Sequence, residues 1–250
     1  MLFSCGGAGS STTTTPPTTA TIAPTTSTIT TTTTVVTTTT VVTTTTVVTT
    51  TTVAPPVYSE EALDYFAEVT FGPEFGGGSQ AIRKWTQDMR IAVYGTPNED
   101  DLATLAEVIA DLNEIIGTIE LEIVESGENV ELHFAPEEEF ESIESNYEPG
   151  NLGFFWVWWD GTESISNARI LISTTELTQA ERSHLIREEL TQSLGLMNDS
   201  FSYEDSIFYQ GWTDTGTYSE LDEMLIEMLY LPKIGPGMEP GEVLELLGGG

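Results

Sequence analysis

Apolar residues recur at helical spacing in four stretches of the chain. An amphipathic helix is predicted over 58–72, and a longer one follows the expected N-cap Asn98 and ends at Gly117. A third helix begins near Thr178 and a fourth covers 220–229. The apolar stripes of the first two helices are Ala62, Tyr65, Phe66 and Val69, and Leu102, Leu105, Val108, Ile109, Leu112, Ile115 and Ile116.

Short apolar runs between the helices have the composition of strands. Residues 82–85 lead into the first predicted strand, 89–95, and the other predicted strands are 119–125, 129–135, 154–159 and 168–173. Ser126-Gly127-Glu128 indicates a hairpin turn between the second and the third strand, and the acidic run 137–144 indicates a helical turn on the surface. The aromatic strand 154–159 suits core packing, with a platform for a carbohydrate or peptide as the alternative.

This order of helices and strands predicts an α/β (α+β) fold with one core. We place this single domain at 57–250, with a loose, Gly-rich C-terminal end from about residue 235. Residues 6–56 are rich in Thr, Pro and Val and carry no charge, and the hexad TTTTVV occurs three times from Thr31 to Val48. Six residues with two valines cannot form a packed layer, so a disordered, extended stalk is expected.

The one cysteine, Cys5, lies in Leu2-Phe3-Ser4-Cys5-Gly6, which looks like a bacterial lipobox. We interpret residues 1–5 as the remnant of a signal peptide and Cys5 as the lipidation site. The protein is then expected outside the cytoplasm, either lipid-anchored to the bacterial cell membrane or secreted. Nothing else in the sequence is apolar enough to span a bilayer.

The net charge of -33 falls wholly on residues 57–250. Only seven basic residues oppose 40 acidic ones, so nucleic acid and anionic headgroups are excluded as partners. The membrane is therefore expected to be reached through Cys5 alone. The acidic surface is either a solvated face or one that gathers cations.

The third helix has two distinct faces. Its start, Thr178-Gln179-Ala180-Glu181, resembles a capping box. Ile186, Leu190, Leu194 and Met197 share one side, while His184, Glu188 and Gln192 fall at i, i+4 and i+8 on nearly the opposite side. That second face is polar and can border a cleft.

The run EELTQSLGLMN from Glu188 to Asn198 resembles the metzincin motif H-E-x-x-H-x-x-G-x-x-H. In this resemblance Glu188, Gln192 and Asn198 replace the three histidines, while Glu189 and Gly195 keep the glutamate and the glycine. The stretch Ser206-Ile207-Phe208-Tyr209 is similar to the metzincin methionine turn, with Phe208 in place of methionine. Residues 219–230 look like the closing helix.

A closer match is a bacterial family, many of its members secreted or lipid-anchored, with the signature E-E-L-x-Q-x-L-G-L-x-N-D. Residues 188–199, 206–208 and 232–238 match it almost position for position. The resemblance implies a metzincin-like (zincin-like) domain with a mixed twisted sheet, an active-site-type helix and a C-terminal helix. It implies no established activity.

The donor atoms argue against zinc, because zinc prefers nitrogen and sulfur ligands to a carboxylate and two amides. The oxygens of Glu188, Gln192, Asn198 and Asp199 suit calcium instead, and the sequence assigns no definite metal ligand. His184 is either a substitute ligand or a histidine paired with a carboxylate.

Three hypotheses on the function follow from the sequence. The first is a cell-surface lipoprotein that binds or scaffolds in the envelope, with an extended peptide or glycan in its cleft. The second is a peptidase-like hydrolase with Glu189 as general base and an unusual metal or none. The third is a display module in which the stalk matters most. The sequence sets no oligomeric state.

Overall fold

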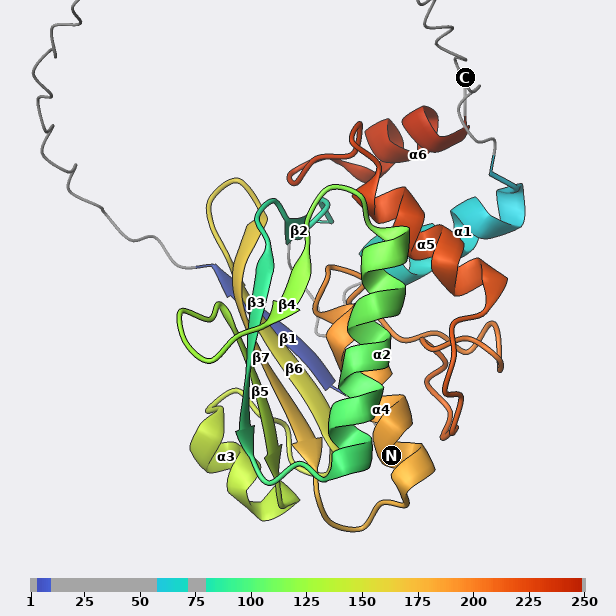
Figure 1. Ribbon diagram of the computed structural model, residues 1–250. Coiled ribbons are helices and arrows are strands. Elements are labelled where there is room, and N and C mark those ends of the chain that lie inside the picture. Colours follow the sequence, from blue (N-terminus) through green and yellow to red (C-terminus); the bar gives the residue numbers. More distant parts are fainter. Residues whose placement is uncertain (1–3, 10–57, 72–79, 249–250) are drawn as a thin grey trace, which may run out of the picture. The chain divides into compact units, whose positions relative to one another are not determined.

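The computed structural model describes residues 4–9, 58–71 and 80–248 (Figure 1). The strands are β1 Ser4–Gly9, β2 Lys84–Trp85, β3 Met89–Gly95, β4 Leu121–Ile123, β5 Val130–Ala135, β6 Gly153–Trp159 and β7 Ser164–Ser173. The helices are α1 Glu60–Phe71, α2 Glu99–Ile115, the 3₁₀ turn η1 Glu137–Glu139, α3 Phe140–Ile143, α4 Gln179–Gln192, α5 Glu220–Tyr230 and α6 Pro240–Gly248. The predicted α/β single domain is confirmed.

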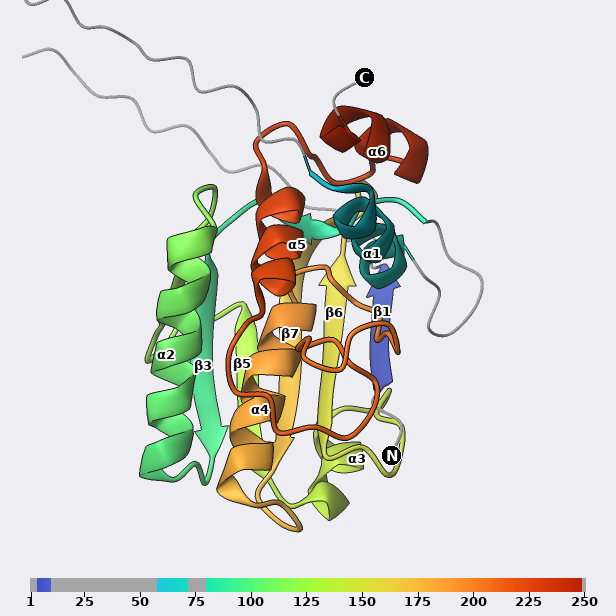
Figure 2. The ribbon, with the colours of Figure 1, turned by 90° about the vertical axis from the view of Figure 1, so that its right-hand side faces the viewer.

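One mixed sheet runs through the domain in the order β1-β6-β7-β5-β3-β4, and β2 pairs with β7. Neighbours from β7 to β4 are parallel, as is β2 to β7. Strand β6 runs antiparallel to β7, and β1 runs parallel to β6 at the edge. In Figure 2 the strands β3, β5, β7, β6 and β1 follow one another across the sheet.

Helices α2 and α4 lie side by side over one face of the sheet (Figures 1 and 2). Beneath them strands β2 to β7 contribute apolar side chains to one core, among them Ile91, Leu132, Phe155 and Ile170, which are at most 1% exposed. This alternation follows from the two-residue period of a strand.

A smaller apolar cluster lies on the opposite face, where α3 packs, and Phe154 belongs to it. Trp156 and Trp158 are half-buried there, and the Arg169 guanidinium lies 5.6 Å from the ring centroid of Trp158. Core packing therefore accounts for Phe154 and Phe155 of the aromatic strand, while two tryptophans keep a partly open surface.

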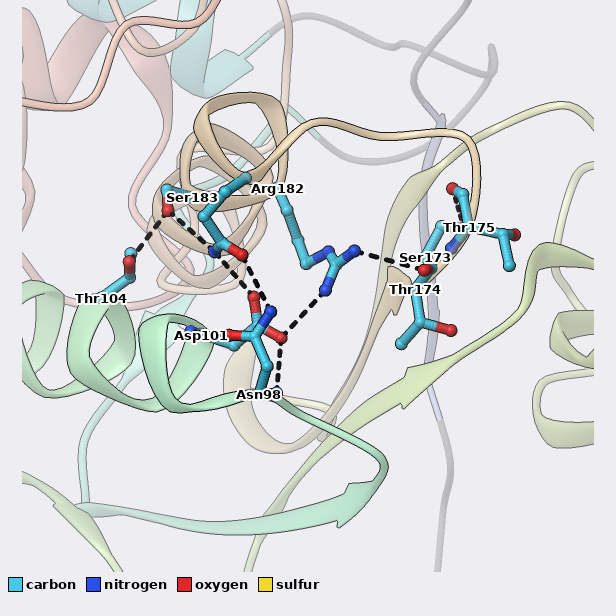
Figure 3. Close-up of polar contacts among 9 residues, drawn as sticks. Asn98, Asp101, Thr104, Ser173, Thr174, Thr175, Arg182 and Ser183 are labelled. Carbon is cyan, nitrogen blue, oxygen red and sulfur yellow. Dashed lines mark hydrogen bonds and ion pairs between the residues drawn. The ribbon is translucent and has the colours of Figure 1, made fainter.

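A polar network fixes the start of α4 (Figure 3). The buried carboxylate of Asp101 accepts hydrogen bonds from Gln179 at 2.9 Å and from Arg182 at 3.1 Å. Arg182 also donates to the carbonyl of Thr174 after β7, at 3.2 Å. Asn98 and Thr178 form the predicted caps, each within a capping box. The N-termini of α2 and α4 are thus tied to each other and to the end of β7.

Two predictions, on the pairing of two strands and on the end of the chain, were wrong. The strands 119–125 and 129–135 do not form a hairpin, because β4 and β5 are both parallel to β3 and lie on opposite sides of it. The end of the chain is not loose from residue 235, because α6 forms there and buries Val243 and Leu247.

The predicted boundary between lipobox and stalk, at Gly6, falls within β1. The rest of the stalk lies outside the described residues. Within the described ranges no helix is long and apolar enough to cross a membrane.

Candidate functional site

Helix α4 is buried around its whole circumference from His184 to Gln192. The apolar side predicted for it is buried in the main core through Ile186, Leu190 and Leu194. Its polar side, which the sequence analysis expected to border a cleft, is covered as well. The polar side chains of α4 therefore meet protein atoms rather than open solvent.

Glu188 is 0% exposed and lies beside His184, with 3.3 Å between its Oε2 atom and Nε2 of the imidazole. Neither carboxylate oxygen of Glu188 receives an aligned hydrogen bond. Nδ1 of His184 donates to the carbonyl oxygen of Thr215 at 2.8 Å. Burial lowers the pKa of His184, but Glu188, Thr215 and Asp214 outweigh it, so the pKa lies above its usual value.

Glu189 points away from Glu188, as the 100° step between adjacent helical residues requires. It is 1% exposed and lies against β6, where a Cβ atom added to Gly153 would stand 2.3 Å from its Oε1 atom. The absence of a side chain at Gly153 therefore gives the Glu189 carboxylate its place against the sheet.

Gln192 and Asn198 contact two other parts of the molecule. Nε2 of Gln192 donates to Oδ1 of Asp199. The backbone N–H and the side-chain amide of Asn198 both donate to the carbonyl of Val69, each at 3.0 Å. That carbonyl belongs to the last turn of α1, where helix carbonyls have no partner within the helix, so Asn198 caps α1.

Gly195 turns the chain after α4. Its φ is +123°, and an added Cβ atom would lie 2.0 Å from the carbonyl oxygen of Arg83. Both the backbone conformation and the close approach require glycine here.

The turn 206–209 is fixed to α5 and α1. Ser206 donates to Asp222 at 2.6 Å and accepts a hydrogen bond from the Tyr65 hydroxyl at 2.7 Å, while the N–H of Ile207 donates to Asp222 at 3.1 Å. Phe208 is fully buried. The predicted turn residues therefore support the core beside α4, and Tyr209 is half-buried at its rim.

Residues 210–218 cover the polar face of α4, although the sequence predicted no role for them. Trp212 donates through its indole N–H to Glu181 at 2.9 Å, and the Tyr218 hydroxyl lies 2.7 Å from the hydroxyl of Thr191. The one sequence feature that could have indicated a role for this segment is the tryptophan between Gly211 and Gly216.

The zinc ion that a metzincin-like fold implies does not fit these residues. Glu188, Gln192 and Asn198 contact His184, Asp199 and α1 respectively, so their donor atoms do not converge on one point. Over the described ranges no group of three or more His, Cys, Asp or Glu side chains could hold a metal ion. A carboxylate and two amides are in addition poor zinc ligands.

The predicted lipidation site, Cys5, lies elsewhere, in β1, where it pairs with Phe155 of β6. The other histidine of the chain, His133, lies on the opposite face of the sheet and is stacked on Tyr94 at a centroid distance of 4.9 Å.

The described chain is thus a single α/β domain built around helix α4, which is buried from His184 to Gln192. It belongs to the DUF2927 family, described as a protein of unknown function, whose profile matches residues 59–248. A search of curated protein sequences found no match.

A comparison with solved structures matched two structures of myroilysin. One has 12% identity over 60% of this chain and 82% of that chain, with a TM-score of 0.39. The other has 13% identity over 67% of this chain and 96% of that chain, with a TM-score of 0.41.

Proposed function

We propose that this domain is a degenerate, metzincin-like binding module that holds an extended peptide along β6 without hydrolysing it. The observation that carries the proposal is the separate commitment of Glu188, Gln192 and Asn198 to three different partners. Side chains engaged in this way support the fold, and they leave no common point at which a metal could activate water.

The edge of β6 that β1 occupies supplies the binding surface, so the peptide would take the place of β1. Strand β1 pairs with β6 in parallel over six residues, from Ser4 opposite Phe154 to Gly9 opposite Trp159. The sequence of β1, SCGGAG, offers little beyond its backbone, so backbone pairing alone suffices to add a strand here. A peptide ligand would make the same bonds and add side-chain contacts.

The cellular setting belongs to the same proposal. A lipid on Cys5 would anchor the module outside the cytoplasm, and the uncharged Thr-rich segment would act as its stalk.

The test selects ligands for the full-length protein from a displayed library of random dodecapeptides. Selected peptides are synthesised in two forms, unmodified and N-methylated at alternate residues. We expect N-methylation to weaken binding at least tenfold, because it removes the N–H groups that a sheet edge requires. A synthetic SCGGAG peptide should compete with the selected ones. Failure to select any peptide, or equal binding of both forms, would overturn the proposal.

Hydrolysis with Glu189 as general base is the alternative function. It is measured by mass spectrometry of casein incubated with the wild type and with Glu189→Gln, with added zinc, calcium or chelator. We expect no cleavage above the blank in any sample and equal peptide binding by both proteins. Cleavage by the wild type that Glu189→Gln abolishes would establish the hydrolase instead.

A further inference from the structure

The segment 210–218, called here the strap, spans almost the full length of α4. It contacts the first turn of the helix through Trp212 and Glu181, the next turn through Thr215 and His184, and the last turn through Tyr218 and Thr191. In Figure 2 the connection between α4 and α5 lies on the same side of the sheet as α4.

The strap is a thin cover. Residues 211–217 are all half-buried or exposed, and Trp212 is 45% exposed. The backbone of Thr215 is held by side chains, since its N–H donates to the Thr213 hydroxyl and its carbonyl accepts from His184. A segment with little buried apolar surface belongs to the least stable parts of a fold.

What the strap covers is polar. His184 is 2% exposed and Glu188 is 0% exposed, and the two form an ion pair with 3.3 Å between Nε2 and Oε2. Apart from this pair, neither carboxylate oxygen of Glu188 accepts an aligned hydrogen bond. Opening of the strap would therefore present carboxylate lone pairs that can accept N–H groups of a ligand.

Helix α4 packs on β6 where Glu189 lies against Gly153. We propose that the strap opens so that the peptide held along β6 also reaches the polar face of α4, where Glu188 accepts N–H groups of the ligand. This inference rests on the proposed function and adds a gate to it. Trp212 and Tyr218 hold the two ends of the gate closed through their hydrogen bonds to α4. His184 lies at its middle, bonded to both the strap and Glu188.

Hydrogen exchange on the full-length protein, followed by mass spectrometry, tests the gate without any ligand. The variants are Trp212→Phe and Tyr218→Phe, which keep an aromatic ring but lose one hydrogen bond each, and their combination. The matched control is Thr217→Ala, at an exposed strap residue that makes no hydrogen bond to α4. Each single variant should speed exchange of the strap amides about fivefold, and the pair about 25-fold, with α5 unchanged.

Wild-type strap amides that exchange no faster than the core of α4 would overturn the gate. So would variants that match Thr217→Ala. The selected dodecapeptides give the second readout, since their association rate should rise with the exchange rate of the strap. Equal peptide association rates for the wild type and the strap variants would refute the gate and leave the binding function intact. A strap that opens in a protein without peptide ligands would refute the binding function alone.

Discussion

Lys84 places an amine inside the molecule, 4% exposed. Its Nζ atom donates to the carbonyls of Leu229 at 2.6 Å and Ile234 at 3.1 Å, and it lies 4.6 Å from the ring centroid of Tyr230. Burial lowers the pKa of Lys84 to about 8. A neutral amine keeps two N–H donors, so both carbonyl contacts survive loss of the charge.

The stability of the protein should therefore depend on pH through Lys84. Between about pH 8 and the ordinary lysine value of 10.5, the unfolded chain binds this proton more often than the folded one, so folding is favoured as the pH rises. Relative to Lys84→Met, the wild type should gain up to about 1 kcal/mol per pH unit from pH 8 upward. Urea unfolding of both proteins from pH 7 to 9.5 measures the difference, and a difference independent of pH would contradict the lowered pKa.

At the scale of elements, the sequence predicted what depends on local pattern. The N-caps Asn98 and Thr178 and the strand 89–95 follow from spacing within a few residues, and the structure confirms them. The false hairpin arose because the parallel pairing of β4 and β5 depends on β3, which lies at least 26 residues earlier in the chain. Local turn chemistry cannot register such a distant partner.

In the candidate site, too, local features could be predicted from the sequence and contacts with distant segments could not. The helical face carrying His184, Glu188 and Gln192 could be predicted from the period of α4. Its partners could not, because Thr215 and the cap of α1 by Asn198 come from segments distant in the chain. The sequence identified the polar residues of this face, but the predicted open cleft beside them was wrong because the face is buried.

Gly195 is the sharpest test of the turn after α4. Gly195→Ala should destabilise the protein by about 3 kcal/mol, because alanine strains at φ +123° and its Cβ meets the Arg83 carbonyl. Gly161→Ala is the matched control, since nothing lies within 4 Å of its added Cβ. Urea unfolding compares the two, and equal stabilities would show that the turn relaxes without penalty.

At the scale of the whole molecule, the surplus of acidic groups is the dominant electrostatic feature. Four of the five arginines form ion pairs with acidic side chains. The pairs are Arg83 with Glu163, Arg169 with Glu131 and Glu144, Arg182 with Asp101, and Arg187 with Glu107 and Asp111. Most of the 40 acidic residues therefore lack a basic neighbour to offset them, since the chain has only seven. Their mutual repulsion opposes the compact state.

Added salt should consequently stabilise this protein. Raising NaCl from about 20 mM to about 500 mM shortens the screening length severalfold and should raise Tm measurably. The control is a triple variant at exposed positions of and near β4, Glu114→Gln, Glu122→Gln and Glu125→Gln, whose gain with salt should be smaller. Calorimetry at each salt concentration gives both values. A Tm that falls with salt would mean that the ion pairs outweigh the repulsion.

The three separate contacts of Glu188, Gln192 and Asn198 also bear on how such a domain evolves. A histidine introduced at any one of these positions removes the His184 pair, the Asp199 bond or the cap of α1 before any metal site exists to replace it. A metal site built here one residue at a time would therefore pass through variants that are less stable and still lack the complete set of ligands.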